Sequence, residues 1–241
     1  MVGTVLRVPR GIALPVACCA VLAAAALTGG CARVVGGTAR AGDPQPRSAA
    51  PIPVADLLIE PSRFPAQYPA AVVPAKDVDR VLAEIDGVPD GSEVTPAQCA
   101  PLPQLADQKA AAQGTDDSGA RLTVTVVRPV ASVRARVTQL TDCPSFSTTT
   151  GEASEVSTVT VKLPPAPPVD ADDSYAVDQT VTSTSSEGSD TRTLTLVALI
   201  RDVQVTASWQ QQQSSGTSPD TQALDTLFTD AVLVVSQKIP R

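Results

Sequence analysis

The sequence predicts a single α+β domain, in which one mainly antiparallel sheet of about five or six strands is covered by helices. Three observations lead to this fold class. Apolar and polar residues alternate in residues 121–128 and 203–209, as they do in half-buried strands. Residues 194–200 are almost entirely apolar, which is typical of a central strand covered on both faces. Residues 224–235 form an apolar stripe at helical spacing, and such a stripe packs against a sheet.

Further helices are predicted from apolar spacing and from the residues that start and stop a helix. Residues 78–85 place apolar side chains at i, i+3, i+4 and i+7 before Gly87, and residues 130–140 repeat at helical spacing. Residues 104–113 are rich in alanine and weakly periodic, so they are predicted to form a short helix. The last helix is expected to begin at Ser218-Pro219-Asp220, which supplies a capping hydroxyl, a proline in the first turn and an early acid.

The stretch from residue 146 to residue 209 is rich in residues that favour strands. Alternation predicts two strands near residues 159–163 and 175–181, in addition to those named above. Arg201 and Asp202 are expected to form the turn between the last two strands. Because most of these strands follow one another through short turns, their pairing should be antiparallel.

Residues 1–30 are predicted to be a lipoprotein signal peptide. Arg7 and Arg10 precede residues 12–27, an apolar stretch of 16 residues that is short for a membrane span. Small residues then lead to Cys31. The alternatives are an ordinary secretory signal cleaved near the same point and an uncleaved anchor.

The residues around Cys31 favour lipid attachment. Leu27-Thr28-Gly29-Gly30-Cys31 resembles the lipobox of bacterial lipoproteins, in which signal peptidase II cuts before a diacylglyceryl-modified cysteine. Thr28 stands where Leu is usual. The resemblance implies that Cys31 carries lipid and that the protein is anchored to the outer face of the cell membrane.

Residues 31–53 are predicted to be a tether, and residues 54–241 to be the folded domain. The tether holds four prolines and shows no apolar period, which is typical of a solvated spacer. Near the start of the domain, the rings of Phe64 and Tyr68 either line a groove or, as we expect, pack onto the core.

The charge of the chain argues against a nucleic-acid partner. The whole chain has 18 basic and 25 acidic side chains; without Arg7 and Arg10 of the leader there are 16 and 25, a net charge of −9. Nucleic-acid binding favours basic surfaces and aromatic stacking platforms, and only 2% of the residues are aromatic.

Cys99 and Cys143 are the two cysteines that follow Cys31. In an exported protein their pairing as a structural disulfide is the economical interpretation. The rival interpretation is a reactive thiol or a thiol–metal site, and the absence of histidine and of C-x-x-C spacing weakens it.

The composition excludes most of the common catalytic mechanisms of hydrolases. The chain contains no histidine, so it has no Ser-His-Asp or Cys-His couple and no histidine ligand for zinc. Asp170, Asp172 and Asp173 lack the Gly and Glu that the EF-hand pattern requires, so we expect a solvated loop there. We predict no enzyme activity, no cofactor and no metal.

Several features together resemble a family of actinobacterial, chiefly mycobacterial, lipoproteins of unknown function. They are the lipobox, the proline-rich tether, Phe64-Pro65, the Cys99/Cys143 pair with Asp142-Cys143-Pro144, the strand into Arg201-Asp202-Val203, and a closing helix. The domain is also similar to the extracellular sensor domain of the receptor Ser/Thr kinase PknH. That similarity implies a helix-covered sheet with a cleft and disulfides. No kinase part is recognised in this chain, so signalling would pass through a partner, and the resemblance assigns no functional residue.

The preferred function is a non-catalytic, sensor-like binding module of the cell envelope. Its ligand or partner would be a small molecule, lipid, glycan or protein. The alternative is a carrier of acyl lipid or glycolipid, which requires a large apolar cavity. A third hypothesis, an enzyme that uses carboxylates alone, is disfavoured because histidine is missing.

Replacement of Cys31 by Ala tests the predicted lipid attachment and membrane anchoring. We expect Cys31→Ala to fold normally but to lose metabolic labelling with palmitate and retention in the membrane fraction, because the only attachment point for lipid is gone. Labelling that continues unchanged would refute lipidation at this residue.

Overall fold

The computed structural model describes residues 52–102, 108–128, 132–151, 155–184, 190–212 and 218–239. Cys31, the predicted signal peptide and most of the predicted tether lie outside these ranges. The strands are β1 (Ala70–Val72), β2 (Glu93–Thr95), β3 (Lys109–Thr115), β4 (Arg121–Val127), β5 (Ser145–Thr150), β6 (Glu155–Lys162), β7 (Asp173–Ser183), β8 (Thr191–Ile200) and β9 (Val203–Gln212). The helices are α1 (Val54–Leu57), α2 (Val78–Asp86), α3 (Val133–Asp142) and α4 (Thr221–Lys238), with short 3₁₀ turns at Pro61–Arg63, Ala75–Asp77 and Ala97–Cys99.

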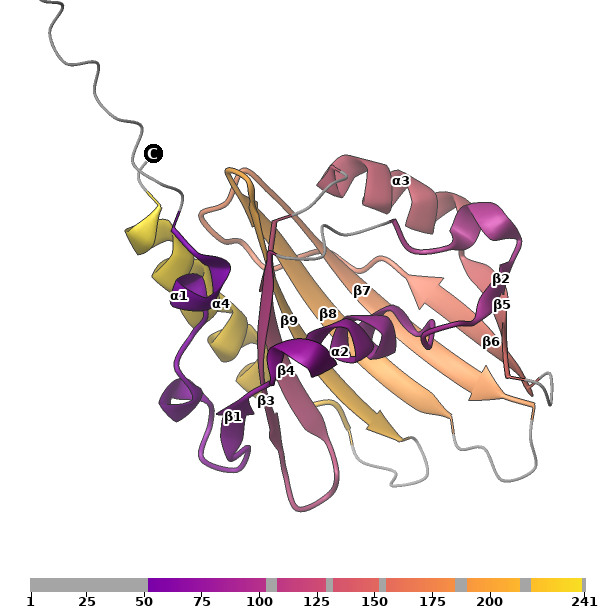
Figure 1. Ribbon diagram of the computed structural model, residues 1–241, viewed down its shortest axis with the longest axis horizontal. Helices are drawn as coiled ribbons and strands as arrows, with labels where there is room; N and C mark the ends of the chain where they lie inside the picture. Colours follow the sequence, from indigo (N-terminus) through magenta and orange to yellow (C-terminus); the bar gives the residue numbers. More distant parts are fainter. Residues whose placement is uncertain are drawn as a thin grey trace, which may run out of the picture. The chain divides into compact units, whose positions relative to one another are not determined.

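The predicted α+β class is confirmed, but the sheet is larger than expected. The described residues form one sheet of nine strands in the order β1-β3-β4-β9-β8-β7-β6-β5-β2, where five or six strands were predicted. Every pairing between neighbours is antiparallel. Helix α4 lies behind the sheet and α2 lies in front of it (Figure 1).

The additional strands come from segments whose sequences carry weak signals. Residues 109–113 belong to β3, so the helix predicted over residues 104–113 is wrong there; residues 104–107 lie outside the described ranges. Alanine favours a helix, but pairing of β3 with β4 over seven residues overrides that preference. Strands β1 and β2 have three residues each and form the two edges of the sheet.

The larger hydrophobic core lies between the sheet and α4. Leu227 and Phe228 of α4 are buried against Val124, Ala207 and Leu196 of the central strands. The N-cap lies two residues later than predicted, at Asp220 and not at Ser218: the Asp220 Oδ1 accepts from the Ala223 N–H at 3.0 Å.

Two aromatic residues from the first part of the domain complete this core. Phe64 is 7% exposed and Tyr68 is 2% exposed, and both belong to the same hydrophobic cluster as Phe228. The expectation that they pack onto the core is therefore confirmed. The backbone of β3 passes close to this segment: a Cβ on Gly114 would lie 2.5 Å from the Tyr68 carbonyl oxygen, so only glycine fits.

A second hydrophobic cluster surrounds the bridge between Cys99 and Cys143. The disulfide joins the turn after β2 to the end of α3, and the cluster includes Leu140, Phe146 and Val159. The bridge therefore ties an edge of the sheet to a helix.

No helix in the described part of the chain is long and apolar enough to cross a membrane.

Removal of the bridge should destabilise the domain. On the chain-entropy model, closing a loop with a sequence separation of 44 contributes about 4 kcal/mol to the free energy of unfolding. We therefore expect Cys99→Ala with Cys143→Ala to unfold at a lower urea concentration, followed by the fluorescence of Trp209. Reduced wild-type protein is the comparison that separates loss of the bridge from loss of buried sulfur, and equal stability of the oxidised and reduced forms would contradict the prediction.

Candidate functional site

The two faces of the central strands differ in chemistry. Successive side chains of a strand point to opposite faces, and directly paired residues of antiparallel neighbours share one face. Thr125 of β4 is paired with Thr206 of β9, and Thr206 with Val197 of β8. The face away from α4 thus carries a set of hydroxyls, which we call the polar face: Thr123, Thr125, Thr193, Thr195, Thr206 and Ser208.

The polar face is buried although its side chains are polar. None of its six side chains belongs to a residue that is more than 6% exposed. An unpaired buried hydroxyl costs about 1–3 kcal/mol, and Thr125 Oγ1 has no hydrogen-bond partner among the described residues. Three of the other hydroxyls, those of Thr123, Thr193 and Thr206, accept hydrogen bonds from glutamine amides, so at least half of this face is satisfied by hydrogen bonds within the domain.

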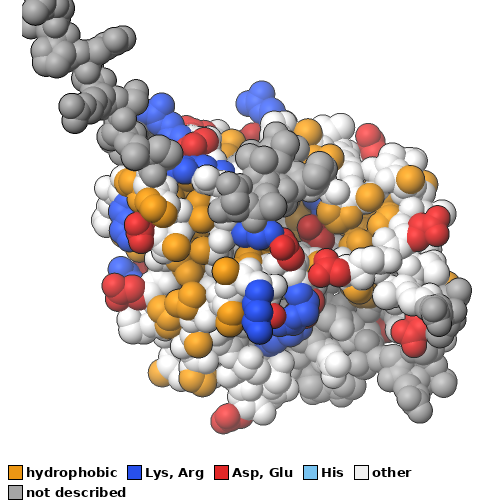
Figure 2. All heavy atoms as spheres, viewed as in Figure 1, with side chains coloured by type: hydrophobic (Ala, Val, Ile, Leu, Met, Phe, Trp, Pro, Cys, Tyr) orange, Lys and Arg blue, Asp and Glu red, His pale blue; other side chains and the backbone are white. Residues whose placement is uncertain are grey.

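Helix α2 lies over part of this face. Val78 and Val81 pack on Ala111 of β3 in a small hydrophobic cluster. The helix ends where its amphipathic sequence predicted, because Gly87 adopts the left-handed conformation at φ 68°. An ion pair between Asp79 and Lys109 adds a polar attachment. In the space-filling view, basic and acidic side chains lie together near the middle of the face that carries α2 (Figure 2).

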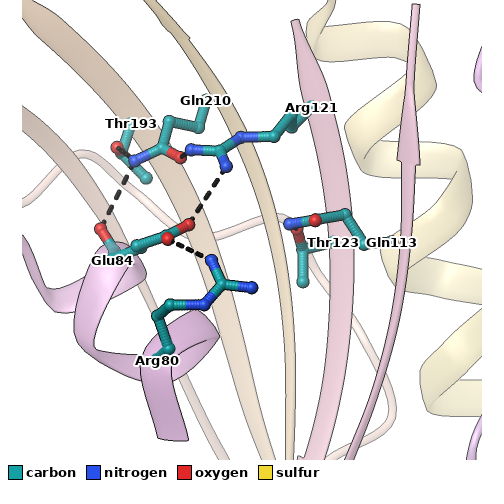
Figure 3. Close-up of polar contacts among 7 residues, drawn as sticks. All are labelled: Arg80, Glu84, Gln113, Arg121, Thr123, Thr193 and Gln210. Carbon is teal, nitrogen blue, oxygen red and sulfur yellow. Dashed lines mark hydrogen bonds and ion pairs between the residues drawn. The ribbon is translucent and has the colours of Figure 1, made fainter. Parts of the chain in front are cut away.

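The C-terminal turn of α2 is joined to the sheet by a polar network, which we call the Glu84 network (Figure 3). Glu84 accepts from Arg80 on its own helix at 2.6 Å and pairs with Arg121 of β4 at 3.1 Å. Arg121 also donates to Gln210 Oε1. Gln210 Nε2 lies 3.3 Å from both Thr193 Oγ1 and the Glu84 carbonyl oxygen. The network fixes the Arg121 guanidinium and the Gln210 amide at the edge of the polar face.

A cavity of about 530 Å³ opens beside this network. Its described lining comes from the end of α2, from six neighbouring strands, β4 to β9, and from the turn before β4: Glu84, Gly87, Pro89, Gly119, Arg121, Thr148, Ser157, Val181, Thr191, Gln210, Gln211 and Gln212. The volume falls in the range of small-molecule sites. The cavity lies where β9 ends and β8 begins, whereas Ile52, whose carbonyl accepts from Arg128 Nη2 at 3.0 Å, lies at the opposite ends of these strands.

A smaller cavity of about 70 Å³ lies among α2, α3 and the sheet. Arg136 of α3 pairs with Asp86 of α2 at 2.8 Å, and both line this cavity together with Tyr175. Burial raises the pKa of Tyr175 to about 12, and the neighbouring Arg136 opposes that rise. The cavity has room for a few water molecules.

The residues singled out in the sequence do not form this site. Cys31 lies outside the described ranges, and Cys99 and Cys143 line neither cavity. Asp172 Oδ2 accepts from the Arg201 N–H at 2.6 Å, and Asp173 pairs with Arg134 at 3.4 Å, so these two carboxylates hold local structure. Within the described ranges, no group of three or more His, Cys, Asp or Glu residues is placed to hold a metal.

The sequence analysis missed the polar face, although a signal for it was present. Threonine alternates with apolar residues in β4, and Thr193 and Thr195 alternate in β8. A polar residue at every second position of a strand normally indicates a solvent-exposed face. Here the alternation instead marks a covered face with a cavity at its end.

The fold and the cavity define a class of domain: a single antiparallel sheet with helices on both faces and a polar hollow at one end of its central strands. The chain belongs to a family described as a domain of unknown function (DUF5642), whose model matches residues 55–236. Comparison with curated proteins finds no match. Among solved structures, the chain is similar to an uncharacterised protein of Mycobacterium smegmatis, the Rv0999 ortholog, with 16% identity and a TM-score of 0.40; the match covers 72% of this chain and 92% of the other.

The two tyrosines of the chain provide a test of this packing. Burial raises the pKa of Tyr68 and of Tyr175 to about 12. In the folded protein, the absorbance of tyrosinate should therefore stay flat through pH 10, where an unperturbed tyrosine ionises, and should rise near pH 12. In urea, both residues should titrate at about pH 10.

The same shifts set the sign of a pH effect on stability. Because the pKa of each tyrosine is higher in the folded state than in the unfolded state, the stabilisation is complete below about pH 10 and is lost as the pH rises towards 12. A tyrosinate signal that appears at pH 10 in the folded protein would contradict the burial of at least one ring.

Proposed function

We propose that this protein is a lipid-anchored lipoprotein of the cell envelope. Its domain binds a polar ligand in the 530 Å³ cavity beside α2 and does not catalyse a reaction. The observation that carries the proposal is the lining of that cavity. Hydroxyls of Thr148, Ser157 and Thr191 lie around one hollow with the amides of Gln210 and Gln212, which share a face at the end of β9. Convergent polar groups in a concave site of this size are typical of ligand binding.

The proposed anchoring in the cell envelope rests on the sequence around Cys31, and two features of the domain support it. The Cys99–Cys143 disulfide is typical of proteins outside the reducing cytosol. Ile52, the first described residue, lies at the opposite ends of the central strands from the cavity. The chain therefore enters the domain at a point remote from the cavity.

The proposed role is that of a sensor-like module. The sequence resembles actinobacterial lipoproteins and the extracellular sensor domain of PknH, and a helix-covered sheet with a polar hollow suits such a role. We propose that occupancy of the cavity is passed to a partner protein. The Glu84 network would take part, because it joins α2 to the cavity wall through Arg121 and Gln210.

The lining favours a polar ligand over an acyl chain. Of the described lining residues, Val181 and Pro89 have apolar side chains, whereas most others carry a hydroxyl, an amide or a charge. The hydroxyls of Thr148, Ser157 and Thr191 would lose water to a hydrocarbon chain without gaining a hydrogen bond from it, at about 1–3 kcal/mol for each hydroxyl. An acyl-lipid carrier is therefore the weaker candidate, and native mass spectrometry that found co-purifying lipid would favour it.

A thermal-shift measurement tests the proposed binding. The full chain, purified in detergent, is heated with fractions of a cell-envelope extract. A ligand at ten times its Kd stabilises the folded state by about 1.4 kcal/mol, which corresponds to roughly 3–6 °C for a domain of this size. We expect Gln210→Met to lose this shift, because the amide that contacts Thr193 and the Glu84 carbonyl is removed.

A matched variant controls for the loss of an amide elsewhere. Gln67 is exposed and its amide lies 3.4 Å from Asp220 on the α4 side of the domain, so Gln67→Met should keep the full shift. Basal melting of both variants is measured first to show that they fold. If no fraction shifts the wild-type protein, the ligand-binding proposal fails.

A further inference from the structure

Four of five neighbouring strands give the cavity beside α2 a hydrogen-bonding side chain, and the fifth, β7, gives the apolar Val181. Five neighbouring strands, β5 to β9, each contribute a lining residue: Thr148, Ser157, Val181, Thr191 and Gln212. Thr148 is directly paired with Ser157, and Thr191 with both Val181 and Gln212. Neighbouring strands lie about 4.8 Å apart, so the row of these five residues spans about 19 Å across the sheet, with a step of two residues between β6 and β7, where Ser157 is paired with Ser183. The row is therefore suited to a ligand that is longer than it is wide.

The charged side chains of the lining are already engaged in ion pairs, and Glu84 is shared between Arg121 and Arg80 of α2. Of the described lining residues, only Glu84 and Arg121 are charged, and they are paired with each other at 3.1 Å. The Arg121 guanidinium is further engaged by Gln210. A charged ligand would lose hydration on entering the cavity without meeting an unpaired charge of opposite sign from these residues. A neutral ligand loses less hydration free energy on entering the cavity.

The remaining groups match a ligand with many hydroxyls. Side chains of Ser, Thr and Gln both donate and accept, as do sugar hydroxyls and acetamido groups. In a linked chain of pyranose rings the repeat is similar to the spacing between strands, so successive sugar units can meet successive strands. None of the described lining residues is aromatic, so affinity would come from hydrogen bonds and would be modest.

We propose that the cavity binds a segment of neutral glycan, about three or four sugar units long, laid across strands β5 to β9 at one end of the sheet. This inference rests on the proposed function and narrows it to one ligand class. We take the glycan to be a free or polymeric strand and not a glycolipid headgroup, and vesicles of a neutral galactolipid distinguish the two sources below.

Calorimetry with matched oligosaccharides tests the ligand class. The full chain in detergent is titrated with triacetylchitotriose and maltotriose, which are neutral, with the de-N-acetylated chitosan trimer, which is cationic, and with trigalacturonate, which is anionic. We expect at least one neutral trimer to bind, and we expect both charged trimers to bind at least tenfold more weakly. The acetylated and de-acetylated trimers share rings and linkage, so their comparison isolates charge.

Hydroxyl-deleting variants test the position of the site. Thr191→Val and Ser157→Ala each remove one hydroxyl from the row, and each should weaken binding of the neutral trimer roughly three- to tenfold. Thr182→Val is the matched control, since Thr182 is exposed on the opposite face of β7, and it should bind as wild type.

The outcomes separate this inference from the function on which it rests. Equal or tighter binding of a charged trimer overturns the neutral-glycan class. The neutral-glycan class is also overturned if none of the four trimers binds while an envelope fraction still shifts the melting temperature. In both cases the proposed function as a ligand-binding module is retained. Unchanged affinity in Thr191→Val and Ser157→Ala overturns the site. Binding to vesicles of a neutral galactolipid, with none to soluble trimers, overturns the free or polymeric source.

Discussion

The alternation of side chains along β4, β9 and β8 is the constraint on which the rest of the structure depends. Each of these strands must supply one face to the core beneath α4 and the other to the helices in front. Antiparallel pairing keeps Leu122, Leu194 and Trp209 in one set and Thr123, Thr193 and Ser208 in the other. A shift of one residue in any of these pairings would bring hydroxyls into the apolar core, so the chemistry of both faces fixes the register.

The same alternation explains why α2 and α4 are attached so differently. Helix α4 meets an apolar surface and is held by buried Leu227, Phe228 and Val235. Helix α2 meets hydroxyls and amides, so its apolar contact shrinks to a few residues around Ala111 and charged contacts supplement it. Such polar attachments are weaker in high salt than apolar packing is. The attachment of α2 to the sheet should therefore depend on ionic strength more than that of α4 does.

The sequence predicts the elements with strong periodicity and misses those whose structure depends on distant partners. Helix α2, strands β8 and β9 and the α4 stripe follow from spacing that is visible within each segment. Strand β3 does not, because its alanines favour a helix until β4 pairs with them. The cavity could not be predicted either: it needs Thr148 and Gln212 at one end of the sheet, and only the order of the strands brings them together. The threonines of β4 were visible, but their burial depends on α2.

The short edges of the sheet have a consequence for the membrane anchoring that we propose. Strands β1 and β2 expose few unpaired backbone groups, and Pro69 and Pro96 stand directly beside them, where they cannot donate hydrogen bonds to another strand. Molecules anchored to a membrane meet their neighbours far more often than molecules in free solution do. Edges of this kind would let such a protein be crowded without joining its sheets into larger aggregates.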